Sequence, residues 1–376
     1  MKDLIWIEIS KNAVIKNLKQ LRKIVGDDVV LSVAVKANAY GHGIKGISKL
    51  LVENGADWLS VNSIEEAEIL RNNKIKKPIL IMGFVQKKDL SRVVDLDARI
   101  FLYDISTAKE LSKIAVKKGK NVFVHIKVDT GLSRLGILSD EVSSFVKNLK
   151  KLNNLVVEGV ATHFATDDDG NDDGYFRSQL ASFRNIAKIL KENGIDDLMI
   201  NGSSSASAII CDGLEFDIIR AGIAIYGYHS SEYVKNYCKN NKIKFLPALS
   251  LKTKVAQVKE ISKGSCVSYG CDFVSEKKMK IAVLPVGYSD GLDRKLGNVG
   301  HVLIKEKKAR IVGRVCMNMM VVNISGIAGV ASEDEVVLIG NQGKQKITAD
   351  DIAKQTGSIN YEVLARLRES IARHYV

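Results

Sequence analysis

The stretch 30-VLSVAVKANAYGHG-43 carries the pattern that decides the fold. Its first part is a run of apolar, largely β-branched residues typical of a buried strand, and its second part is a turn rich in glycine and small residues. Because side chains alternate between the two faces of a strand, Ser32, Ala34 and Lys36 share one face. We therefore expect a strand whose small residues point into an enclosed interior, with Lys36 at its carboxyl end.

The same succession of β-branched run, polar turn and helical period recurs over the first two-thirds of the chain. The expected strands are 30–36, 57–61, 78–83, 99–103, 122–128, 156–162, 198–201 and 216–220, and the expected helices between them include 64–72, 106–118, 140–151 and 177–193. Ser10 is expected to cap a further helix before the first of these strands. Eight strands alternating with helices predict a (β/α)8 barrel of the TIM type. A doubly wound open sheet is the alternative, although no glycine-rich nucleotide fingerprint follows any strand.

The pattern changes after about residue 242, where short strand-like segments follow one another without crossover helices. These segments are 250–261, 266–269, 279–286, 300–304, 308–315, 319–324 and 335–340, and two short helices are expected near 348–355 and 361–367. A chain of 376 residues also exceeds the usual size of one hydrophobic core. The sequence therefore predicts a barrel domain over 1–241 and a mostly β C-terminal domain over 242–376.

The composition is that of an ordinary globular protein with an excess of lysine. The net charge is +13, but no basic run is interleaved with aromatic residues, so nucleic-acid binding is not expected. No apolar run is long enough to span a membrane and the first residues contain no signal peptide, which predicts a cytoplasmic protein. An odd number of cysteines without CxxC spacing predicts free thiols rather than disulfides or a zinc site. The five cysteines are Cys211, Cys238, Cys266, Cys271 and Cys316.

Strand alternation places several titratable groups at one rim of the predicted barrel. The residues expected to point inward from the fifth and sixth strands are Phe123, His125, Lys127 and Asp129, and Val157, Gly159, Ala161 and His163. Catalytic groups of such barrels gather at the carboxyl ends of the strands. A lysine at a strand end is usually a surface residue, but the small neighbours of Lys36 favour a pocket. Burial there would lower its pKa and suit it to imine formation with a carbonyl cofactor.

A phosphate group could be held by the loops that follow the seventh and eighth strands. The serines of 203-SSSAS-207 offer hydroxyl groups, and Gly222 and Ile223 offer backbone N–H groups. Helix capping alone would explain one or two of these serines. The acidic stretch 167-DDDGNDD-173 resembles a calcium loop, but Ser178 stands where a glutamate ligand is needed. We expect a solvated acidic loop there.

Eight motifs in sequence order resemble those of alanine racemases, which depend on pyridoxal 5′-phosphate (PLP). The first, 35-VKANAYGHG-43, is similar to the PLP-attachment motif. The others are 127-KVDTGLSRLG-136, 162-THFA-165, 220-RAGI-223 with 226-YG-227, 267-VSYG-270, 286-VGYSDG-291, 313-GRVCM-317 and 360-NYE-362. The resemblance covers essentially the whole chain. It implies a PLP-binding barrel and a homodimer with shared active sites that interconverts L- and D-alanine, the D-isomer serving cell-wall peptidoglycan.

The resemblance also implies a role for each matching residue. Lys36 would hold PLP as a Schiff base and act as the base on the D side, and Tyr269 from the partner subunit would act on the L side. Arg220 would face the pyridine nitrogen, with His163 behind it. The phosphate would be held by Tyr40, Ser205, Gly222, Ile223 and Tyr361, and the substrate carboxylate by Arg134 and the backbone at Met317. Lys127, often carbamylated in the family, would steady the arginine, and Tyr288 would line the entrance.

This assembly makes chemical sense, because racemisation needs one base on each face of Cα. A tyrosine has a pKa of ~10 in water, so Tyr269 needs cationic neighbours such as Arg220 or His163. Three departures from the family pattern stand out. Asn318 replaces an aspartate, and Ser204 replaces an asparagine, which leaves the phosphate-binding serine as Ser204 or Ser205. The residues 367-LRESIAR-373 replace the usual Arg-Val-Pro-Arg tail.

Several other functions are compatible with parts of this pattern. A racemase for serine, lysine or arginine would use the same residues, because a small pocket rejects one hydroxyl poorly. A decarboxylase on the related barrel is disfavoured, since Tyr269 stands where a cysteine acid is expected. A non-catalytic PLP-binding barrel would need neither a second domain nor the Tyr269 motif.

Overall fold

The computed structural model describes residues 3–170, 174–211 and 216–376. The chain forms two compact units. The barrel unit consists of Val14–Ala37 and Ile44–Leu246, and the β unit consists of Met1–Ala13, Asn38–Gly43 and Pro247–Val376. The short segment Asn38–Gly43, which begins two residues after Lys36, thus belongs to the β unit although the strand before it belongs to the barrel unit.

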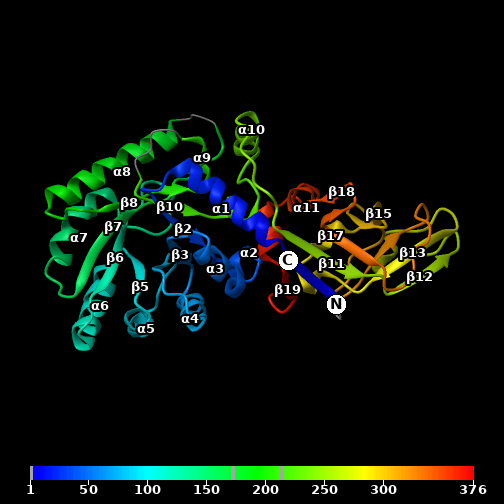
Figure 1. Ribbon diagram of the computed structural model, residues 1–376, viewed down its shortest axis with the longest axis horizontal. Helices are drawn as coiled ribbons and strands as arrows, with labels where there is room; N and C mark the ends of the chain where they lie inside the picture. Colours follow the sequence, from blue (N-terminus) through cyan, green and yellow to red (C-terminus); the bar gives the residue numbers. More distant parts are fainter. Residues whose placement is uncertain (1–2, 171–173, 212–215) are drawn as a thin grey trace. The chain divides into compact units, whose positions relative to one another are not determined.

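The strands of the barrel unit form one parallel sheet (Figure 1). They are β2 (Val30–Ala34), β3 (Trp58–Val61), β4 (Ile79–Ile81), β5 (Ala98–Leu102), β6 (Val122–Lys127), β7 (Leu155–Ala161), β8 (Met199–Asn201), β9 (Ser203–Ser204) and β10 (Ile218–Ala221). Their spatial order is β8-β7-β6-β5-β4-β3-β2-β10-β9. The eight predicted strands are confirmed, and the short strand β9 is additional.

The sheet closes into a TIM-type barrel. The last long strand, β10, pairs with the first, β2, in parallel register from Ile218 opposite Val30. On its other side, the backbone N–H of Asp217 donates to the carbonyl of Ile200 at 3.0 Å, and the N–H of Ile200 donates to the Asp217 carboxylate at 2.6 Å. A doubly wound sheet leaves its edge strands apart, so these contacts exclude that alternative.

Helices alternate with the strands and lie outside them in Figure 1. The helices up to residue 240 are α1 (Lys11–Val25), α2 (Lys36–Tyr40), α3 (Ile44–Glu53), α4 (Ile64–Asn72), η1 (Lys87–Asp89), α5 (Leu90–Asp95), α6 (Ile105–Lys118), η2 (Ser139–Glu141), α7 (Val142–Leu149), α8 (Tyr175–Glu192), α9 (Ser205–Ile210), η3 (Ile223–Tyr226) and α10 (Glu232–Asn240). Ser10 accepts from the N–H of Ala13 at 3.3 Å, which confirms it as the cap of α1.

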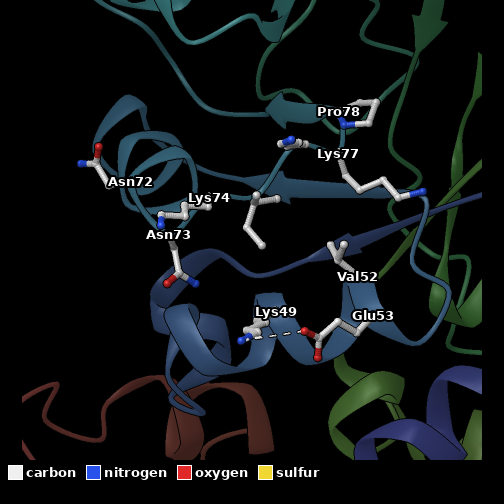
Figure 2. Close-up of a pocket in the computed structure, with 10 residues that line it drawn as sticks. Lys49, Val52, Glu53, Asn72, Asn73, Lys74, Lys77 and Pro78 are labelled. Carbon is white, nitrogen blue, oxygen red and sulfur yellow. Dashed lines mark ion pairs between the residues drawn. The ribbon is translucent and has the colours of Figure 1, made fainter.

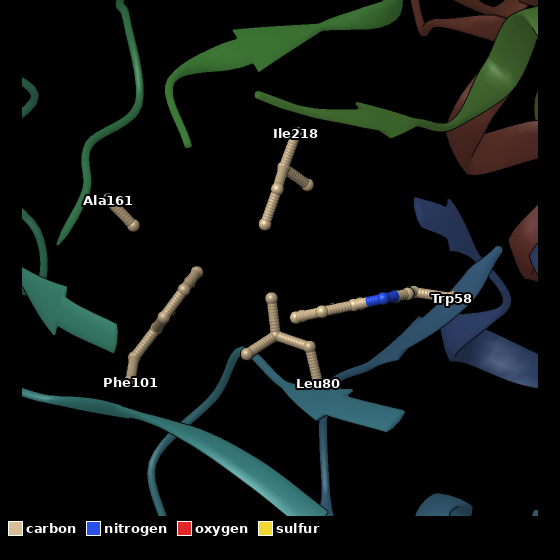
Figure 3. Packing of buried hydrophobic residues seen from close by; sticks show 5 residues of the cluster. All are labelled: Trp58, Leu80, Phe101, Ala161 and Ile218. Carbon is tan, nitrogen blue, oxygen red and sulfur yellow. The ribbon is translucent and has the colours of Figure 1, made fainter. Parts of the chain in front are cut away.

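Apolar side chains from five strands fill the barrel (Figure 3). They are Trp58, Leu80, Phe101, Ala161 and Ile218. These side chains give the inside of the barrel a packed apolar core.

An ion pair also lies inside the barrel. The alternation of side chains along the strands did not predict it. Glu158 accepts two hydrogen bonds from Arg99 at 2.8 and 3.0 Å and faces the buried His125 at 3.3 Å. The guanidinium of Arg99 in turn stacks on Trp58. Simple alternation assigns Glu158 to the outer face, but the register of β6 and β7 shifts between Val124 and His125. This bulge brings Glu158 inward next to Gly159.

The β unit is built on a second sheet, whose order is β12-β13-β16-β15-β14-β17-β11-β1-β19, with β18 paired to β17. Its strands are β1 (Ile5–Ile9), β11 (Leu249–Lys254), β12 (Gln257–Ile261), β13 (Met279–Leu284), β14 (His301–Ile304), β15 (Lys307–Ile311), β16 (Met320–Asn323), β17 (Glu335–Gln342), β18 (Gln345–Ile347) and β19 (Ala372–Tyr375). Its helices are η4 (Tyr269–Cys271), η5 (Tyr288–Asp290), η6 (Arg294–Leu296), α11 (Ala349–Thr356) and α12 (Asn360–Ala365).

Three features of the β unit differ from the sequence-based prediction. The expected strand 250–261 is two strands, β11 and β12, and the expected strand 266–269 is a turn that runs into η4. The N-terminal strand β1 lies between β11 and β19, so both ends of the chain take part in this sheet rather than in the barrel. Such long-range pairing leaves no local signal in the sequence. Within the described residues, no helix combines the length and apolar character needed to cross a membrane.

Candidate active site

Lys36 is half-buried at the carboxyl end of β2, separated from the strand by one residue, and is the first residue of α2. Burial lowers the pKa of its amine, and the positive charges of Arg134 and Arg220 lower it further, while Glu66 acts in the opposite direction. Glu66 also accepts from the backbone N–H of Ala37 at 2.7 Å and so fixes the turn that follows the lysine. The amine therefore lies in cationic, partly dry surroundings that favour its neutral, nucleophilic form.

The turn after Lys36 has an unusual backbone. Ala37, Asn38, Ala39 and Tyr40 all have φ between 51° and 54°, so α2 is a left-handed turn. Side chains with a Cβ disfavour this conformation by about 1–2 kcal/mol per residue. Strain of this kind persists only where the surrounding structure imposes it and is often found at functional sites.

The β unit holds the end of this turn from the C-terminal strand β19. The Nε–H of Arg373 donates to the carbonyl of Gly41 at 2.9 Å, and the hydroxyl of Tyr375 donates to the carbonyl of His42 at 2.9 Å. The rings of Tyr40 and Tyr361 lie 6.0 Å apart, so two of the residues predicted to hold the phosphate are neighbours. The divergent tail thus positions the turn next to Lys36.

Arg220 is the centre of a buried hydrogen-bond network at the ends of β7, β8 and β10. Its side chain donates to the carbonyls of Asn201 at 2.9 Å and Thr162 at 2.8 Å, and to Nδ1 of His163 at 3.3 Å. It also donates to the side-chain oxygen of Asn201. Asn201 was not predicted as a site residue, although the alternation rule that found Lys36 also places it at the inner end of its strand.

His163 and Arg220 carry different charges at neutral pH. Burial lowers the pKa of His163 to about 2, and Arg220 and Lys127 contribute to the shift. Burial lowers the pKa of Arg220 to about 10, which still leaves the guanidinium protonated at neutral pH. His163 is therefore a neutral acceptor toward Arg220, and the expectation that it supplies positive charge was wrong. Of these two side chains, Arg220 is the one that carries a positive charge.

Lys127 is the last residue of β6, and its side chain is buried. Burial lowers the pKa of its amine well below the usual value, and Arg220 and Arg134 lower it further. Asp129, two residues on, accepts from the backbone N–H groups of Gly131 at 2.9 Å and Arg134 at 2.8 Å. This carboxylate thus shapes the loop that presents the exposed side chain of Arg134, rather than serving only as a partner for charged side chains.

Two serines of the cluster, Ser204 and Ser205, have different hydrogen-bond partners. The Ser204 hydroxyl caps α9, accepting from the N–H of Ala206 at 3.1 Å, and donates to Asp167 at 2.7 Å. The Ser205 hydroxyl accepts from the N–H of Gly222 at 2.7 Å. Two of the predicted phosphate ligands, Ser205 and Gly222, therefore meet at one point.

Asp167 corrects the prediction of a solvated acidic loop. Its carboxyl group is buried, and burial raises its pKa while the Ser204 hydroxyl has the opposite effect. Asp169 is exposed as expected. Residues 171–173, which form the end of that predicted loop, lie outside the described residues.

Tyr269 lies in the β unit at the tip of a loop, with 71% of its surface exposed. Cys266 and Cys271, on either side of it, form a disulfide. The prediction of five free thiols was therefore wrong for this pair, which escaped notice because its spacing is not CxxC. Cys211, Cys238 and Cys316 keep their thiols.

Met317 and Tyr288 lie on two packed loops of the β unit. The carbonyl of Met317 accepts from the backbone N–H of Ser289 at 3.0 Å and from its hydroxyl at 2.9 Å. A Cβ on Gly287 would lie 2.2 Å from the carbonyl oxygen of Cys316, so only glycine allows this approach. Asn318 donates to the Ser289 hydroxyl at 2.8 Å and so stabilises the same pair of loops.

A groove of about 660 Å³ lies elsewhere on the barrel unit, between α3 and the segment that leads into β4 (Figure 2). Lysines line much of it, including Lys49, which pairs with Glu53 at 3.9 Å. Pro78 precedes β4, so the groove is at the amino ends of the strands, opposite to Lys36. It contains none of the predicted site residues.

Comparison with known proteins agrees with this arrangement over the whole chain. The family models "Alanine racemase, N-terminal domain" and "Alanine racemase, C-terminal domain" match residues 9–230 and 248–375. An alanine racemase of Methanococcus maripaludis is 39% identical over 373 residues, which cover 99% of this chain and 98% of that protein. One from Clostridium perfringens is 40% identical over 372 residues, which cover 99% of this chain and 95% of that protein.

A solved structure is also similar to this chain over its whole length. The alanine racemase of Bacillus anthracis with bound L-Ala-P superposes with a TM-score of 0.94 at 32% identity, covering 100% of this chain and 96% of that one. Family models and relatives thus agree over both units of the chain. The protein is an enzyme of the isomerase class, and it belongs to the alanine racemase family.

Proposed function

We propose that this chain interconverts L-alanine and D-alanine with PLP as its cofactor, using Lys36 and Tyr269 as two opposed bases. The observation that carries the proposal is the half-buried amine of Lys36, whose pKa is lowered by burial and then by Arg134 and Arg220. An amine in such surroundings suits both covalent attachment of an aldehyde and transfer of a proton near neutral pH. The L-Ala-P bound to the Bacillus anthracis relative supports an alanine-like substrate here.

The residues of the barrel unit fit PLP. Ser205 and Gly222 meet at one point, where the Ser205 hydroxyl accepts from the Gly222 N–H and keeps its own proton for a phosphate oxygen. Within the described residues, every hydrogen bond of Arg220 starts from its two terminal nitrogens, which leaves the Nε–H as a donor for a ring nitrogen. Ile223 begins the short helix η3 and would add an N–H to the phosphate site. Tyr40 and Tyr361 are the phosphate ligands proposed from the β unit.

The protein's own groups would then divide the chemistry. When bound, PLP supplies the electron sink that makes the substrate Cα–H acidic. The Nζ of Lys36 would take or return the Cα proton on one face, and the hydroxyl of Tyr269 from a partner subunit would do so on the other. Arg220 keeps its own protons and would limit charge build-up on the ring, which disfavours side reactions. Arg134 and the Met317 backbone would hold the substrate carboxylate, and Tyr288 would line the entrance.

Lys127 and His163 would support these groups. The low pKa of the buried Lys127 amine favours the neutral form, which is the form that reacts with carbon dioxide to give a carbamate. A carbamate there would place a negative charge near Arg134 and steady it. Neutral His163 would link Arg220 to the incoming tyrosine. We further propose a cytoplasmic homodimer that supplies D-alanine to peptidoglycan, as the family resemblance implies.

The test compares Lys36→Ala and Tyr269→Phe. Lys36→Ala should abolish the visible absorption of lysine-bound PLP together with all racemisation. Tyr269→Phe should keep the absorption and slow exchange of the L-alanine α-proton with deuterated water by ~10²–10⁴-fold, a typical contribution of one general base. Exchange from D-alanine should change much less. Equal losses from both enantiomers would contradict the two-base assignment, and a persisting band in Lys36→Ala would remove Lys36 from its role.

The same two variants test the shared site. In mixed dimers, one of the two sites combines an intact Lys36 from one subunit with an intact Tyr269 from the other. Mixing the two inactive proteins should therefore restore part of the activity. Hybrid dimers that are shown to form but remain inactive would argue against delivery of Tyr269 from the partner.

A further inference from the structure

The loop that carries Tyr269 is closed at its base by hydrogen bonds. The backbone N–H groups of Ser265 and Ser275 bond across the loop, the first to the Ser275 hydroxyl at 3.0 Å and the second to the Ser265 carbonyl at 2.9 Å. The N–H of Val267 then donates to the carbonyl of Phe273 at 2.9 Å. The base is thus a short hairpin, and the conformation of the tip depends on other contacts.

The tip contains the disulfide between Cys266 and Cys271, whose Cα atoms lie 5.0 Å apart. Tyr269 lies between them, three residues after the first cysteine and two before the second. Both cysteines are exposed in the single chain, where small molecules can reach the sulfur atoms. An exposed disulfide is more readily exchanged than a buried structural one.

The backbone of the tip is held in conformations that L residues rarely adopt. Ser268 has φ of 67° and Cys271 has φ of 48°. The Ser268 hydroxyl donates to the carbonyl of Arg314 at 2.7 Å, and the Arg314 guanidinium pairs with Asp272. Contacts with the rest of the β unit therefore hold Ser268 and Asp272, and the disulfide is the covalent link that constrains the tyrosine between them.

We propose that Cys266 and Cys271 form a thiol–disulfide exchange site, with low-molecular-weight thiols and disulfides as its substrates, that controls the position of Tyr269. The cross-linked form holds the tyrosine in its working position, and the dithiol form releases it. This inference rests on the proposed role of Tyr269 as the base on the L side.

Formation of the Cys266–Cys271 bond needs a two-electron oxidant, and a small disulfide supplies it. One cysteine thiolate attacks a sulfur of that disulfide, breaking its S–S bond, forming a mixed disulfide and releasing one small thiolate. The second cysteine thiolate then attacks the protein sulfur of the mixed disulfide, forming the Cys266–Cys271 bond and releasing the second small thiolate. The two cysteines lose two electrons in total, which the small disulfide gains, and their two protons pass to the released thiols. Reduction is the reverse.

The experiment equilibrates the PLP-loaded protein with glutathione buffers of graded ratio of reduced to oxidised form. Alkylation and mass spectrometry then count the accessible thiols in denatured protein. As the proportion of reduced glutathione increases, the number of thiols per chain should rise from three, which are the cysteines outside the disulfide, to five. Peptide mapping should assign the two additional thiols to Cys266 and Cys271. This readout does not depend on racemase activity.

Activity is measured on the same samples as exchange of the α-proton. We expect exchange from L-alanine to fall about tenfold on reduction, within the ~10²-fold that misplacement of a catalytic group can cost, while exchange from D-alanine changes little. Cys266→Ser with Cys271→Ser should reproduce the reduced rate in every buffer. The matched control Cys211→Ser, in the barrel unit, should keep the full response.

Two outcomes would overturn the proposal. A thiol count that stays at three or at five across all buffers would remove the exchange site. If the thiol count changes with the glutathione ratio while exchange from L-alanine stays constant, the disulfide does not control Tyr269. Failure of the proposed function is distinguishable from both, because it would appear as an equal effect of Tyr269→Phe on the two enantiomers.

Discussion

Ser204 and Ser205 are adjacent in sequence, but their hydroxyl groups have different partners. Ser204 uses its hydroxyl within the protein, between the start of α9 and the buried carboxyl of Asp167. Ser205 accepts from Gly222 and keeps its hydroxyl proton for a further acceptor. The contacts therefore favour Ser205 as the phosphate ligand and Ser204 as a structural cap, a choice that the sequence left open.

Substitution of each serine by alanine separates the two roles. Ser205→Ala should weaken PLP binding by about tenfold or more, because a hydrogen bond to a charged group contributes about 1.5–3 kcal/mol, and should also lower the free energy of unfolding by about 1 kcal/mol, because the Gly222 N–H loses its acceptor. Ser204→Ala should lower the free energy of unfolding of the apoprotein by about 1 kcal/mol or more through loss of the cap. PLP titration of the apoprotein and urea unfolding provide the two measurements. The opposite pattern, with PLP affinity lost only in Ser204→Ala, would exchange the assignments.

At the scale of an element, the left-handed turn α2 is held from outside rather than by its own sequence. Ala37 and Ala39 have no preference for positive φ, so local propensity predicts an ordinary turn. The close fit of Gly41 against α12 shows what imposes the geometry, since a Cβ at this position would lie 2.2 Å from the carbonyl oxygen of Leu364. Gly41 itself has φ of 78°.

Gly41→Ala should therefore destabilise the protein through two separate effects. Positive φ alone should cost about 1–2 kcal/mol for alanine. The contact with Leu364 should add about 1–3 kcal/mol, as overpacking does in tight interiors. Gly357→Ala is the matched control, because Gly357 has φ of 69° in the same unit and nothing within 4 Å of an added Cβ. If urea unfolding shows equal losses for the two variants, the close contact with α12 does not contribute.

At the scale of the whole molecule, the sequence predicted what depends on local periodicity. The barrel strands and their helices follow from alternation and helical period, and Lys36, Lys127 and His163 were found because they lie at the ends of such strands, whereas Arg220 was identified only through the family resemblance. The pairing of β1 with β19 was not predictable, since nothing in either segment specifies a partner so distant in sequence.

Contacts within the folded protein decided the other differences. The protonation state of His163 depends on its desolvation and on three-dimensional neighbours, not on the residue type. The inward position of Glu158 depends on one bulge. The disulfide at Tyr269 depends on a turn that brings Cys266 and Cys271 together, which a search for standard cysteine spacings does not detect. These errors share a cause, because each concerns one or two residues whose state is set by contacts made only after folding.

Buried neutral histidines in both units make the stability of the whole protein depend on pH. Burial lowers the pKa of His42 to about 4, with Arg373 contributing, and that of His163 to about 2. In the unfolded chain both pKa values return to ~6.5, so the unfolded state binds more protons as pH falls below this value. The stabilisation is complete above pH ~6.5 and is lost progressively toward pH ~4 for His42 and lower for His163.

Each of these histidines should lower the free energy of unfolding by about 2 kcal/mol between pH 7 and pH 5. His42→Asn tests this directly, because an amide can still donate to the carbonyl of Tyr40, as Nδ1 of His42 does at 2.8 Å, but cannot take up a proton. The difference in free energy of unfolding between the two pH values, measured by urea titration, should be about 2 kcal/mol smaller in His42→Asn than in the parent protein. Measurement at pH 8, where both side chains are neutral, gives the cost of the substitution itself. An unchanged pH dependence would mean that His42 binds a proton as readily in the folded protein as in the unfolded chain, and that its burial does not contribute to acid sensitivity.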